Sequence, residues 1–551
     1  MILVRYQRFH HNASITKGAA AVLAREQTRF WLLVFAVVVF AALMRGVFVA
    51  RSDFPLNDGG LFAAMIDDLQ RADYRLPMTT SYNALDIPYA YPPLGFYSAA
   101  LIGDLTGASP EQVLRFLPLA LTVASIVVFA ALARTVVGER AAAAAVVAYA
   151  VLPRSYLWLI MGGGLTRSLG WLMCLLALRQ GYLLLSRGGR RATVLTALFS
   201  GLTALSHLGT AWFLLFSLVI MWCCLARNRE ALFRLCIAGA GAAVVAAPWW
   251  VAIVERHGWD VFVAAGESGT GSLVEKLIFI VSLNWTYEPL FSLVTMCALL
   301  GAWHCIRHGW FWLPIWTVLI FIFDSRAGLT SAVIPLALLA GLGVSRVAYP
   351  ALRVMIETLE QKRGENEGPS AVARWLLPAI VGIAIAQMTM TSVLAGVVTE
   401  RGLNADEREA MGWVKAHTPA NSHFAIVSGS REWQLDLASE WFPHLANRQS
   451  VATVQGSEWL PENAFARMGD AYEQLQDCAV ADSRCLERWR TEWKATYDFV
   501  YVSKSPPLGE VPRKLARDGE FRWALEFALR ADPRYRLVYD GPGAAIFERL
   551  G

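Results

Sequence analysis

The sequence predicts a polytopic α-helical membrane protein of about eleven transmembrane helices with a C-terminal extracytoplasmic α/β domain. Three observations support this prediction. Of the 551 residues, 56% are hydrophobic and only 17% are charged. Apolar runs of about 20 residues, the length that crosses the hydrocarbon core of a bilayer, recur along the chain. After Val398 the composition changes to that of a soluble domain. An ordinary soluble globular protein is excluded.

The transmembrane region, 30–398, divides into apolar runs separated by short polar segments. We place the predicted spans at 30–50, 113–133, 141–160, 168–186, 194–206, 208–226, 231–254, 277–303, 310–323, 329–349 and 375–398. The first run is about twenty residues long, which exceeds the apolar region of a signal peptide. We therefore expect it to remain in the protein as a span.

The distribution of Lys and Arg predicts the orientation. Segment 1–29 is basic, and we place it in the cytoplasm. Most of the basic residues between later spans, such as Arg190 and Arg227, then fall on the same side, as the positive-inside rule requires. Eleven crossings put residues 399–551 outside.

This external segment predicts a small α/β domain. Buried strands are expected at His423–Ser428 and Asp498–Val502. A hairpin is expected around Asp540-Gly-Pro-Gly, and helical periodicity covers Ala405–His417 and Arg513–Ala531. The strands of the hairpin are predicted at Arg536–Tyr539 and Ala545–Glu548.

Two of the eight cysteines, Cys478 and Cys485, lie in this domain. In an oxidising compartment they could form a disulfide. The alternative is two unpaired thiols. A zinc site is disfavoured because no second pair of Cys or His ligands completes it.

Polar residues gather at the predicted outer ends of the spans. The first external loop, 51–93, is acidic and includes Asp53 and Asp58. It ends in the aromatic segment Tyr91-Pro92-Pro93, which leads into 94–105, a run too short and too interrupted to cross the bilayer. We predict that this run is an interfacial helix. Other outer segments contribute Gly162-Gly-Gly-Leu-Thr-Arg167, Ser206-His207, the loop 255–276 and Asp324-Ser-Arg326.

These features resemble the membrane-embedded class C (GT-C) glycosyltransferases. The layout is similar to that of protein O-mannosyltransferases, aminoarabinose transferases and single-subunit oligosaccharyltransferases. The local motifs that carry the resemblance are Asn57-Asp58-Gly59-Gly60 and Tyr91-Pro92-Pro93-Leu94. The chain departs from many relatives, which have an Asp-Glu pair where Asn57-Asp58 stands, and it lacks the oligosaccharyltransferase Trp-Trp-Asp signature.

The resemblance implies an inverting glycosyltransferase of cell-envelope biogenesis in a bacterial or archaeal plasma membrane. It would move a sugar from a polyprenyl-phosphate donor to a glycan, lipid or protein acceptor on the external face. An acceptor hydroxyl that attacks the sugar must lose a proton, and a carboxylate can accept it. Asp58 is our candidate base and Asp53 the alternative. Either could instead be a solvated residue at the end of a span.

The departing phosphate needs a fixed cation. Arg326 is the first candidate and Arg167 the second, although Arg326 could instead extend towards lipid headgroups. His207 could line the pocket or merely pack, and Tyr91 is a candidate substrate-binding residue. No fixed ligand spacing decides whether a divalent cation such as Mg or Mn takes part.

In the external domain, Glu440, Trp441 and Trp459 belong to clusters of aromatic and charged residues. Tryptophan rings can stack on sugar rings, so these residues could bind the acceptor. Packing of a small domain explains them equally well. The basic residues follow membrane topology and indicate no nucleic-acid partner.

Two other classes of protein remain open. A lipid or polysaccharide flippase or transporter would have internal repeats and charged residues near the bilayer midplane. The sequence has no convincing repeat, and its polar residues cluster at one face, which favours an interfacial enzyme. A non-catalytic scaffold for envelope assembly is the third possibility.

Overall fold

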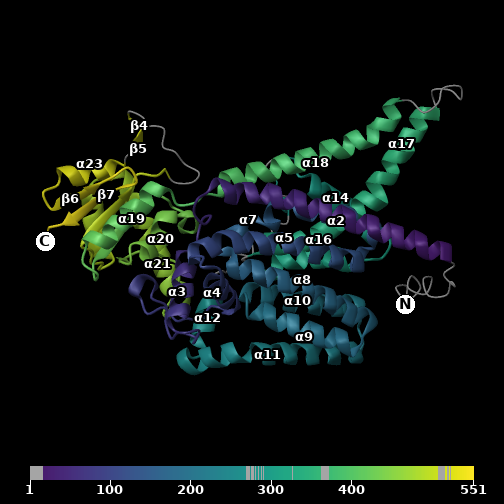
Figure 1. Cartoon of the computed structure of the whole chain (residues 1–551), viewed down its shortest axis with the longest axis horizontal. Coiled ribbons are helices and arrows are strands. Elements are labelled where there is room, and N and C mark those ends of the chain that lie inside the picture. Colours follow the sequence, from purple (N-terminus) through teal and green to yellow (C-terminus); the bar gives the residue numbers. More distant parts are fainter. Residues whose placement is uncertain are drawn as a thin grey trace.

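The computed structural model consists of a block of packed helices joined to an α/β domain (Figure 1). It describes residues 17–267, 291–324, 327–361, 371–506 and 523–550, with short stretches at 274, 278, 281–282, 285–286, 288, 516–517 and 520–521. Helix α2 (Lys17–Arg51) begins at the end of the block that lies farthest from the α/β domain, and it runs towards that domain.

Each predicted span overlaps a helix. Within the described residues, seven helical segments are long and apolar enough to cross a bilayer. They are α2, α5 (Pro110–Val137), α8 (Gly164–Arg187), α10 (Leu208–Leu225), α11 (Arg229–His257), the continuous run of α16 (Gly328–Gly343), η3 (Val344–Ala348) and α17 (Tyr349–Gln361), and α18 (Ala371–Thr399). Shorter helices follow the remaining apolar runs: α9 (Arg190–Ala204), α14 (Leu293–Arg307) and α15 (Trp312–Phe323). The total of eleven crossings stays a prediction.

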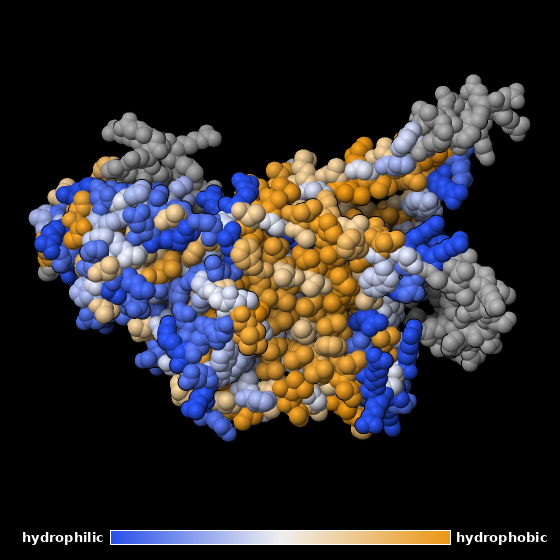
Figure 2. Space-filling view, in the orientation of Figure 1, coloured by the Kyte–Doolittle hydropathy of each residue, from blue (hydrophilic) through white to orange (hydrophobic). Residues whose placement is uncertain are grey.

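The surface of the helical block is apolar where it would meet lipid. Figure 2 shows a broad hydrophobic band across the block, with hydrophilic residues on both sides of it. Large apolar side chains on outer helices are exposed, among them Phe35 and Leu43 of α2 and Val244 of α11. In water such a surface would aggregate, whereas in a bilayer it faces hydrocarbon. The protein is therefore an integral membrane protein.

The predicted span 141–160 is not one straight helix. Helix α6 (Glu139–Val151) is followed by η2 (Pro153–Ser155) and α7 (Leu157–Ile160), and the two parts are bent by 85°. Pro153 explains the break. A proline disfavours helical geometry in the residue before it, and Leu152 is extended, with φ −65° and ψ 126°.

The segment 51–93, which was predicted to be external, folds over the end of the helical block. It contains α3 (Gly60–Arg71) and the short η1 (Tyr82–Ala84), and it leads into α4 (Leu94–Thr106). The last helix matches the predicted helix at 94–105. Most side chains of α3 are buried between the helical block and the α/β domain. A short helix, α12 (Asp260–Glu267), lies in the predicted external loop 255–276.

The α/β domain has a five-stranded mixed sheet in the order β2-β1-β3-β7-β6. Parallel pairs join β1 to β2 and β3, and antiparallel pairs join β7 to β3 and β6. The strands are β1 (His423–Val427), β2 (Gln449–Ser450), β3 (Phe499–Ser503), β6 (Tyr535–Asp540) and β7 (Ala544–Arg549). The predicted strands and hairpin are confirmed.

Helices cover the sheet. They are α19 (Ala405–His417), α20 (Leu437–Leu445), α21 (Ala464–Asp477), α22 (Ser483–Glu492) and α23 (Ala524–Ala531). The helix predicted over Arg513–Ala531 is wrong in its first half. There the described residues form the small pair of strands β4 (Ala516–Arg517) and β5 (Glu520–Phe521), and the helix begins only at Ala524. The sequence of this half contains Gly519, and glycine disfavours a helix interior.

Cys478 and Cys485 form a disulfide. The alternative of two unpaired thiols is therefore wrong. The bond joins the end of α21 to α22. The other six cysteines are free thiols in the helical block.

Candidate active site

Asp58 lies in a tight turn between α2 and α3. The residues on either side have positive φ, 50° for Asn57 and 150° for Gly59. The Asp58 side chain keeps 28% of its surface exposed. One of its oxygens, Oδ1, accepts a hydrogen bond from the backbone N–H of Gly163 at 3.2 Å, and the other, Oδ2, lies 3.1 Å from Nη2 of Arg167. The carboxylate is thus fixed by two partners and remains accessible.

Three consecutive glycines, at positions 162–164, allow the backbone before α8 to approach Asp58 closely. A Cβ on Gly163 would lie 2.4 Å from Oδ2 of Asp58, and a Cβ on Gly162 would lie 2.3 Å from the Asp58 carbonyl oxygen. The Gly163 N–H also donates to that carbonyl at 2.9 Å. Only glycine fits at these two positions without displacing the Asp58 turn.

Arg167 comes from the first turn of α8, directly after the glycines. Its Nε donates to the Gly163 carbonyl at 3.2 Å, and its guanidinium lies over the Trp158 ring at 5.8 Å. The Arg167 side chain is 24% exposed. The geometry therefore brings together two residues that the sequence placed on the outer side independently, the candidate base and the second-choice cation.

Glu440 of α20 holds the other side of the Asp58 turn. Its carboxylate accepts hydrogen bonds from three consecutive backbone N–H groups at the start of α3: those of Gly59 at 3.0 Å, Gly60 at 2.9 Å and Leu61 at 3.2 Å. Burial raises the pKa of Glu440 to about 8, the nearby charge of Asp58 adds to the rise, and the three N–H groups oppose it. The Glu440 carboxylate bonds to the start of α3 and its carbonyl accepts from the Tyr82 hydroxyl of η1 at 2.6 Å, so this residue positions the loop.

Glu400 was missed by the sequence reasoning. It follows α18 directly, is buried, and accepts a hydrogen bond from Nδ2 of Asn57 at 3.3 Å. Burial raises the pKa of Glu400 to about 8, and the charge of Asp58 acts in the same direction. The sequence signal that could have found it is its position at the end of the last predicted span, on the side predicted to be external.

Asn57 joins three parts of the chain. Its backbone N–H donates to the carbonyl of Arg401 at 2.6 Å, its Oδ1 accepts from the N–H of Arg401 at 3.1 Å, and its carbonyl accepts from Nε1 of Trp441 at 2.7 Å. The loop between α2 and α3, the end of α18 and helix α20 therefore meet beside Asp58.

Asp53 lies apart from this group. It forms an ion pair with Arg408 of α19, and its side chain is 70% exposed. The hydrogen bonds from Arg408 lower the pKa of Asp53. Asp53 is therefore held against α19 of the α/β domain, whereas Asp58 meets the glycine turn and Arg167 of the helical block.

The two tryptophans of the predicted clusters are buried. Trp441 is fully buried and packs edge-on against Phe54, with ring centroids 4.6 Å apart. Trp459 is 3% exposed and packs against Tyr91 at 4.8 Å. The Tyr91 hydroxyl bonds to Glu458. These residues serve the packing between loop and domain, and neither tryptophan presents an open face for a sugar in this structure.

Of the remaining predicted residues, His207 caps a helix and Arg326 lies outside the described residues. Nδ1 of His207 accepts the backbone N–H of Thr210 at 3.1 Å, so it caps the start of α10. Asp324, close to Arg326 in the sequence, is buried and accepts hydrogen bonds from the N–H of Ala327 at 2.9 Å and from Oγ of Ser331 at 2.5 Å, which fixes the start of α16.

A buried arginine, Arg45 of α2, supports the helix break that precedes the glycines. It is fully buried, and it donates to the carbonyls of Thr122 at 2.8 Å and Ala150 at 3.0 Å and to Oγ of Ser155 at 3.0 Å. Within the described residues no carboxylate pairs with it. Its position inside the first predicted span was the sequence signal, because a charged residue there needs internal partners.

The described part of the chain holds no group of three or more His, Cys, Asp or Glu residues placed to bind a metal ion. Asp58 is already paired with a guanidinium. Glu440 and Glu400 bond to backbone and amide groups. The donor groups near Asp58 therefore do not form a cation site in this arrangement.

The architecture is similar to that of solved membrane glycosyltransferases. The archaeal oligosaccharyltransferase AglB from Archaeoglobus fulgidus, in complex with an inhibitory peptide and a dolichol-phosphate, superposes with a TM-score of 0.58 at 15% identity, over 86% of this chain and 70% of that one. ArnT from Cupriavidus metallidurans bound to undecaprenyl phosphate gives 0.53 at 17% identity, over 94% and 98%.

The arabinofuranosyltransferase AftD from Mycobacteria gives a TM-score of 0.56 at 17% identity over 94% of this chain. The match spans only 40% of AftD. No protein-family model and no curated protein sequence matches the chain. The solved structures show that the fold is that of the GT-C glycosyltransferases, as the resemblance implied.

Proposed function

We propose that this protein is a membrane-embedded glycosyltransferase that uses a polyprenyl-phosphate-linked sugar and Asp58 as its general base. The observation that carries the proposal is the Asp58 carboxylate, held by Gly163 and Arg167 where the first external loop meets the helical block. The GT-C fold adds support, since two of the similar structures contain a dolichol-phosphate or undecaprenyl phosphate.

The proposed reaction is a single displacement. The acceptor hydroxyl oxygen attacks the anomeric carbon while its proton passes to an oxygen of Asp58. A new C–O bond forms on one face of the sugar. The bond from the anomeric carbon to the phosphate oxygen breaks on the opposite face, and its electron pair leaves with the polyprenyl phosphate. The configuration at the anomeric carbon is inverted.

Arg167 has two parts in this proposal. Its contact with Oδ2 at 3.1 Å orients the Asp58 carboxylate, and Oδ1 stays available to the acceptor hydroxyl beside the N–H of Gly163. A guanidinium has five N–H groups, and those beyond the bonds to Asp58 and Gly163 can reach a phosphate that gains charge as it leaves. Arg326 remains a second candidate for the same phosphate.

Two buried carboxyl groups next to the Asp58 turn affect the charge around the proposed base. Glu400 and Glu440 flank the Asp58 turn, and the raised pKa of each favours the neutral form near pH 7. Asp58 then does not face two further negative charges. The site therefore combines one accessible carboxylate, one cation and a rigid backbone.

The proposed acceptor is an envelope glycan, lipid or protein on the external face. The external face is inferred from the expected topology. The basic N-terminal segment is expected inside, and α2 leads from it to the end of the block that carries the Asp58 loop (Figure 1). Membrane lipids would surround the apolar band.

The test is sugar transfer by the Asp58→Asn variant. Purified protein is incubated with a panel of radiolabelled polyprenyl-phosphate sugars, with the envelope fraction of the source cells as the acceptor pool. Asn keeps the shape of Asp but is a poor proton acceptor, so we expect transfer to fall by about 10²–10⁴-fold. Thermal stabilisation by undecaprenyl phosphate should persist.

The matched control is Asp53→Asn, which removes an exposed carboxylate from the same loop. Transfer by this variant should stay within about threefold of wild type, far from the loss expected for a base. Retention of full transfer by Asp58→Asn would overturn the assignment of the base. Absence of transfer by wild type with every donor would overturn the proposed activity.

A further inference from the structure

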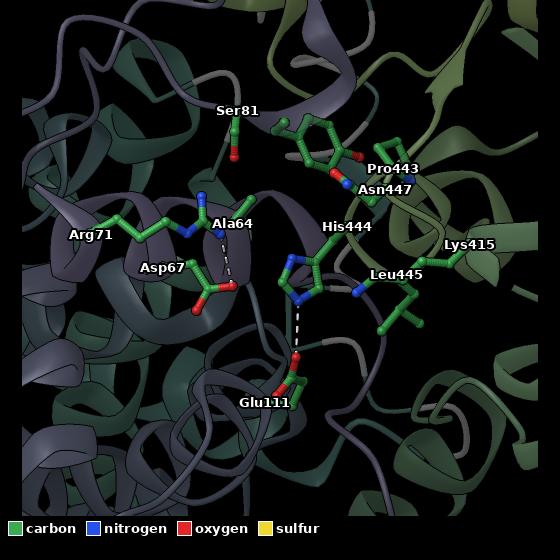
Figure 3. Close-up of a pocket in the computed structure, with 11 residues that line it drawn as sticks. Ala64, Asp67, Arg71, Ser81, Glu111, Lys415, Pro443, His444, Leu445 and Asn447 are labelled. Atoms are coloured by element: carbon green, nitrogen blue, oxygen red, sulfur yellow. Dashed lines mark hydrogen bonds and ion pairs between the residues drawn. The ribbon is translucent and has the colours of Figure 1, made fainter. Parts of the chain in front are cut away.

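A cavity of about 370 Å³ lies between the first external loop and the α/β domain, apart from Asp58. Ala64, Asp67 and Arg71 of α3 line one side, and their spacing places them on one face of that helix. Glu111 at the start of α5 lines a second side, and His444 of α20 lines a third (Figure 3). The volume is within the usual range of ligand sites, about 300–1,000 Å³.

The charged groups of this cavity are partly neutralised in pairs. Nε2 of His444 lies 2.9 Å from Oε1 of Glu111, and Arg71 lies 3.5 Å from Asp67 and 2.9 Å from Asp68. In Figure 3 the Asp67 and His444 side chains lie on opposite sides of the cavity. Burial raises the pKa of Asp67, while the charges of His444 and Arg71 oppose the rise.

The carboxylate oxygens that the ion pairs leave unused can accept hydrogen bonds from the hydroxyl groups of a ligand. The side chains of Asp67 and Glu111 are 31% and 24% exposed, so a ligand can reach their oxygens. A carboxylate offers about four acceptor sites, of which an ion pair uses only one or two. Ser81, Lys415 and Asn447 add further polar groups to the lining. The lining has two carboxylates, Asp67 and Glu111, and two cations, Arg71 and Lys415, so its charges balance and a neutral polyol can bond to groups of either sign.

The cavity is linked to the Asp58 turn through α3 and α20. Glu440 binds the first N–H groups of α3, and His444 lies one turn farther along α20. At about 1.5 Å per helical residue, the cavity-lining residues of α3 begin roughly 6 Å from its Asp58 end. The two places are therefore about one helical turn apart along α3.

We propose that this interdomain cavity is a remote recognition site for neutral carbohydrate, the non-reacting part of a glycan acceptor. The identification of this carbohydrate as an acceptor rests on the proposed glycosyltransferase function. Binding at a distance from the reacting hydroxyl would position that hydroxyl. It also gives the α/β domain a part in choosing the substrate.

The test measures binding without transfer. Saturation-transfer-difference NMR is recorded on the full-length protein in detergent with neutral disaccharides of glucose, galactose and mannose as probes. We expect binding by wild type and by Asp58→Asn. The Asp67→Asn variant should bind about tenfold or more weakly, because it loses hydrogen bonds to a charged acceptor. Glu111→Gln provides a second variant with the same expected effect.

The matched control is Asp73→Asn. This residue is an exposed Asp just after α3, outside the cavity lining, in a positive-φ conformation that Asn tolerates. Its binding should equal that of wild type. The proposal is overturned by absence of disaccharide binding, by binding that neither cavity variant weakens, or by displacement of the sugar by inorganic phosphate. Because no donor is present, these results are independent of whether Asp58 is the base.

Discussion

The guanidinium of Arg167 lies 3.1 Å from the carboxylate of Asp58, although the two residues are 109 positions apart in the sequence. Asp58 follows the first membrane helix, and Arg167 stands in the first turn of α8. The glycines before Arg167 let the two backbones touch, so the pair is built by the fold rather than by a local motif. Several expectations depend on this contact.

Replacement of Arg167 should impair transfer in proportion to the contacts that are lost. Arg167→Ala removes the cation beside Asp58, and we expect kcat to fall by about 10²–10³-fold, as for removal of one charge-stabilising donor. Arg167→Lys keeps a charge but cannot bond to both Asp58 and the Gly163 carbonyl, so its loss should be smaller. Steady-state kinetics with varied donor measures both. Arg484→Ala, at an exposed arginine of the α/β domain, is the control. Equal activity of Arg167→Ala and this control would exclude a role for Arg167.

Gly163→Ala should disturb the site without altering a functional side chain. The added methyl group would lie 2.4 Å from Oδ2 of Asp58 and must displace the carboxylate. Misplacement by about 1 Å can lower activity about 10²-fold. The comparison is Gly239→Ala in α11, where an added Cβ meets nothing within 4 Å. Transfer assays and thermal melting are performed on both, and a fully active Gly163→Ala would show that the close approach is not required.

Glu400 should make the protein less stable as the pH rises. Its pKa in the folded protein is about 8, above the ordinary value of 4.5. Between these two values the folded state keeps a proton that the unfolded state has released, so stability falls as the pH increases through this window. In the Glu400→Gln variant this contribution is absent. The fall in Tm from pH 5 to pH 8.5 should then be smaller than in wild type by roughly 2 °C or more.

The control for this measurement is Glu492→Gln, which changes an exposed glutamate at the end of α22. Its Tm should follow the pH in the same way as the wild-type Tm. Glu440 also makes Tm depend on pH in every variant. The dependence of Tm on pH is therefore compared between variants, because no variant is expected to have a constant Tm. Identical slopes for wild type and Glu400→Gln would contradict the raised pKa of Glu400.

The predicted orientation can be read from cysteine labelling in intact cells. The six free thiols are first replaced, and the Cys478–Cys485 disulfide is left in place. A cysteine at the exposed position Arg467 of the α/β domain should react with a membrane-impermeant maleimide, whereas one at the exposed position Arg190 should react only after lysis. Labelling of both positions, or of neither, in intact cells would contradict an odd number of crossings between them.

The sequence by itself determined where the helices of the membrane region lie and where the α/β domain begins. The information is local: an apolar run of a given length fits a bilayer, and alternation with turn residues defines the strands. Helix α19 has the predicted bounds, Ala405–His417. Even the break at Pro153, which we did not anticipate, has a local cause in the residue pair before and at the proline.

The tertiary structure decided which polar residues meet. The sequence predicted Asp58, Arg167 and Arg326 on one side of the membrane and ranked Arg326 before Arg167, whereas the fold joins Arg167 to Asp58. Glu440 is 380 positions from the N–H of Gly60 that it binds, and Glu400 is 343 from Asn57. Such contacts depend on how helices and domains pack, and periodicity along the chain carries no record of that packing. For the same reason Trp441 and Trp459, which could equally have bound sugar or filled a core, proved to be buried.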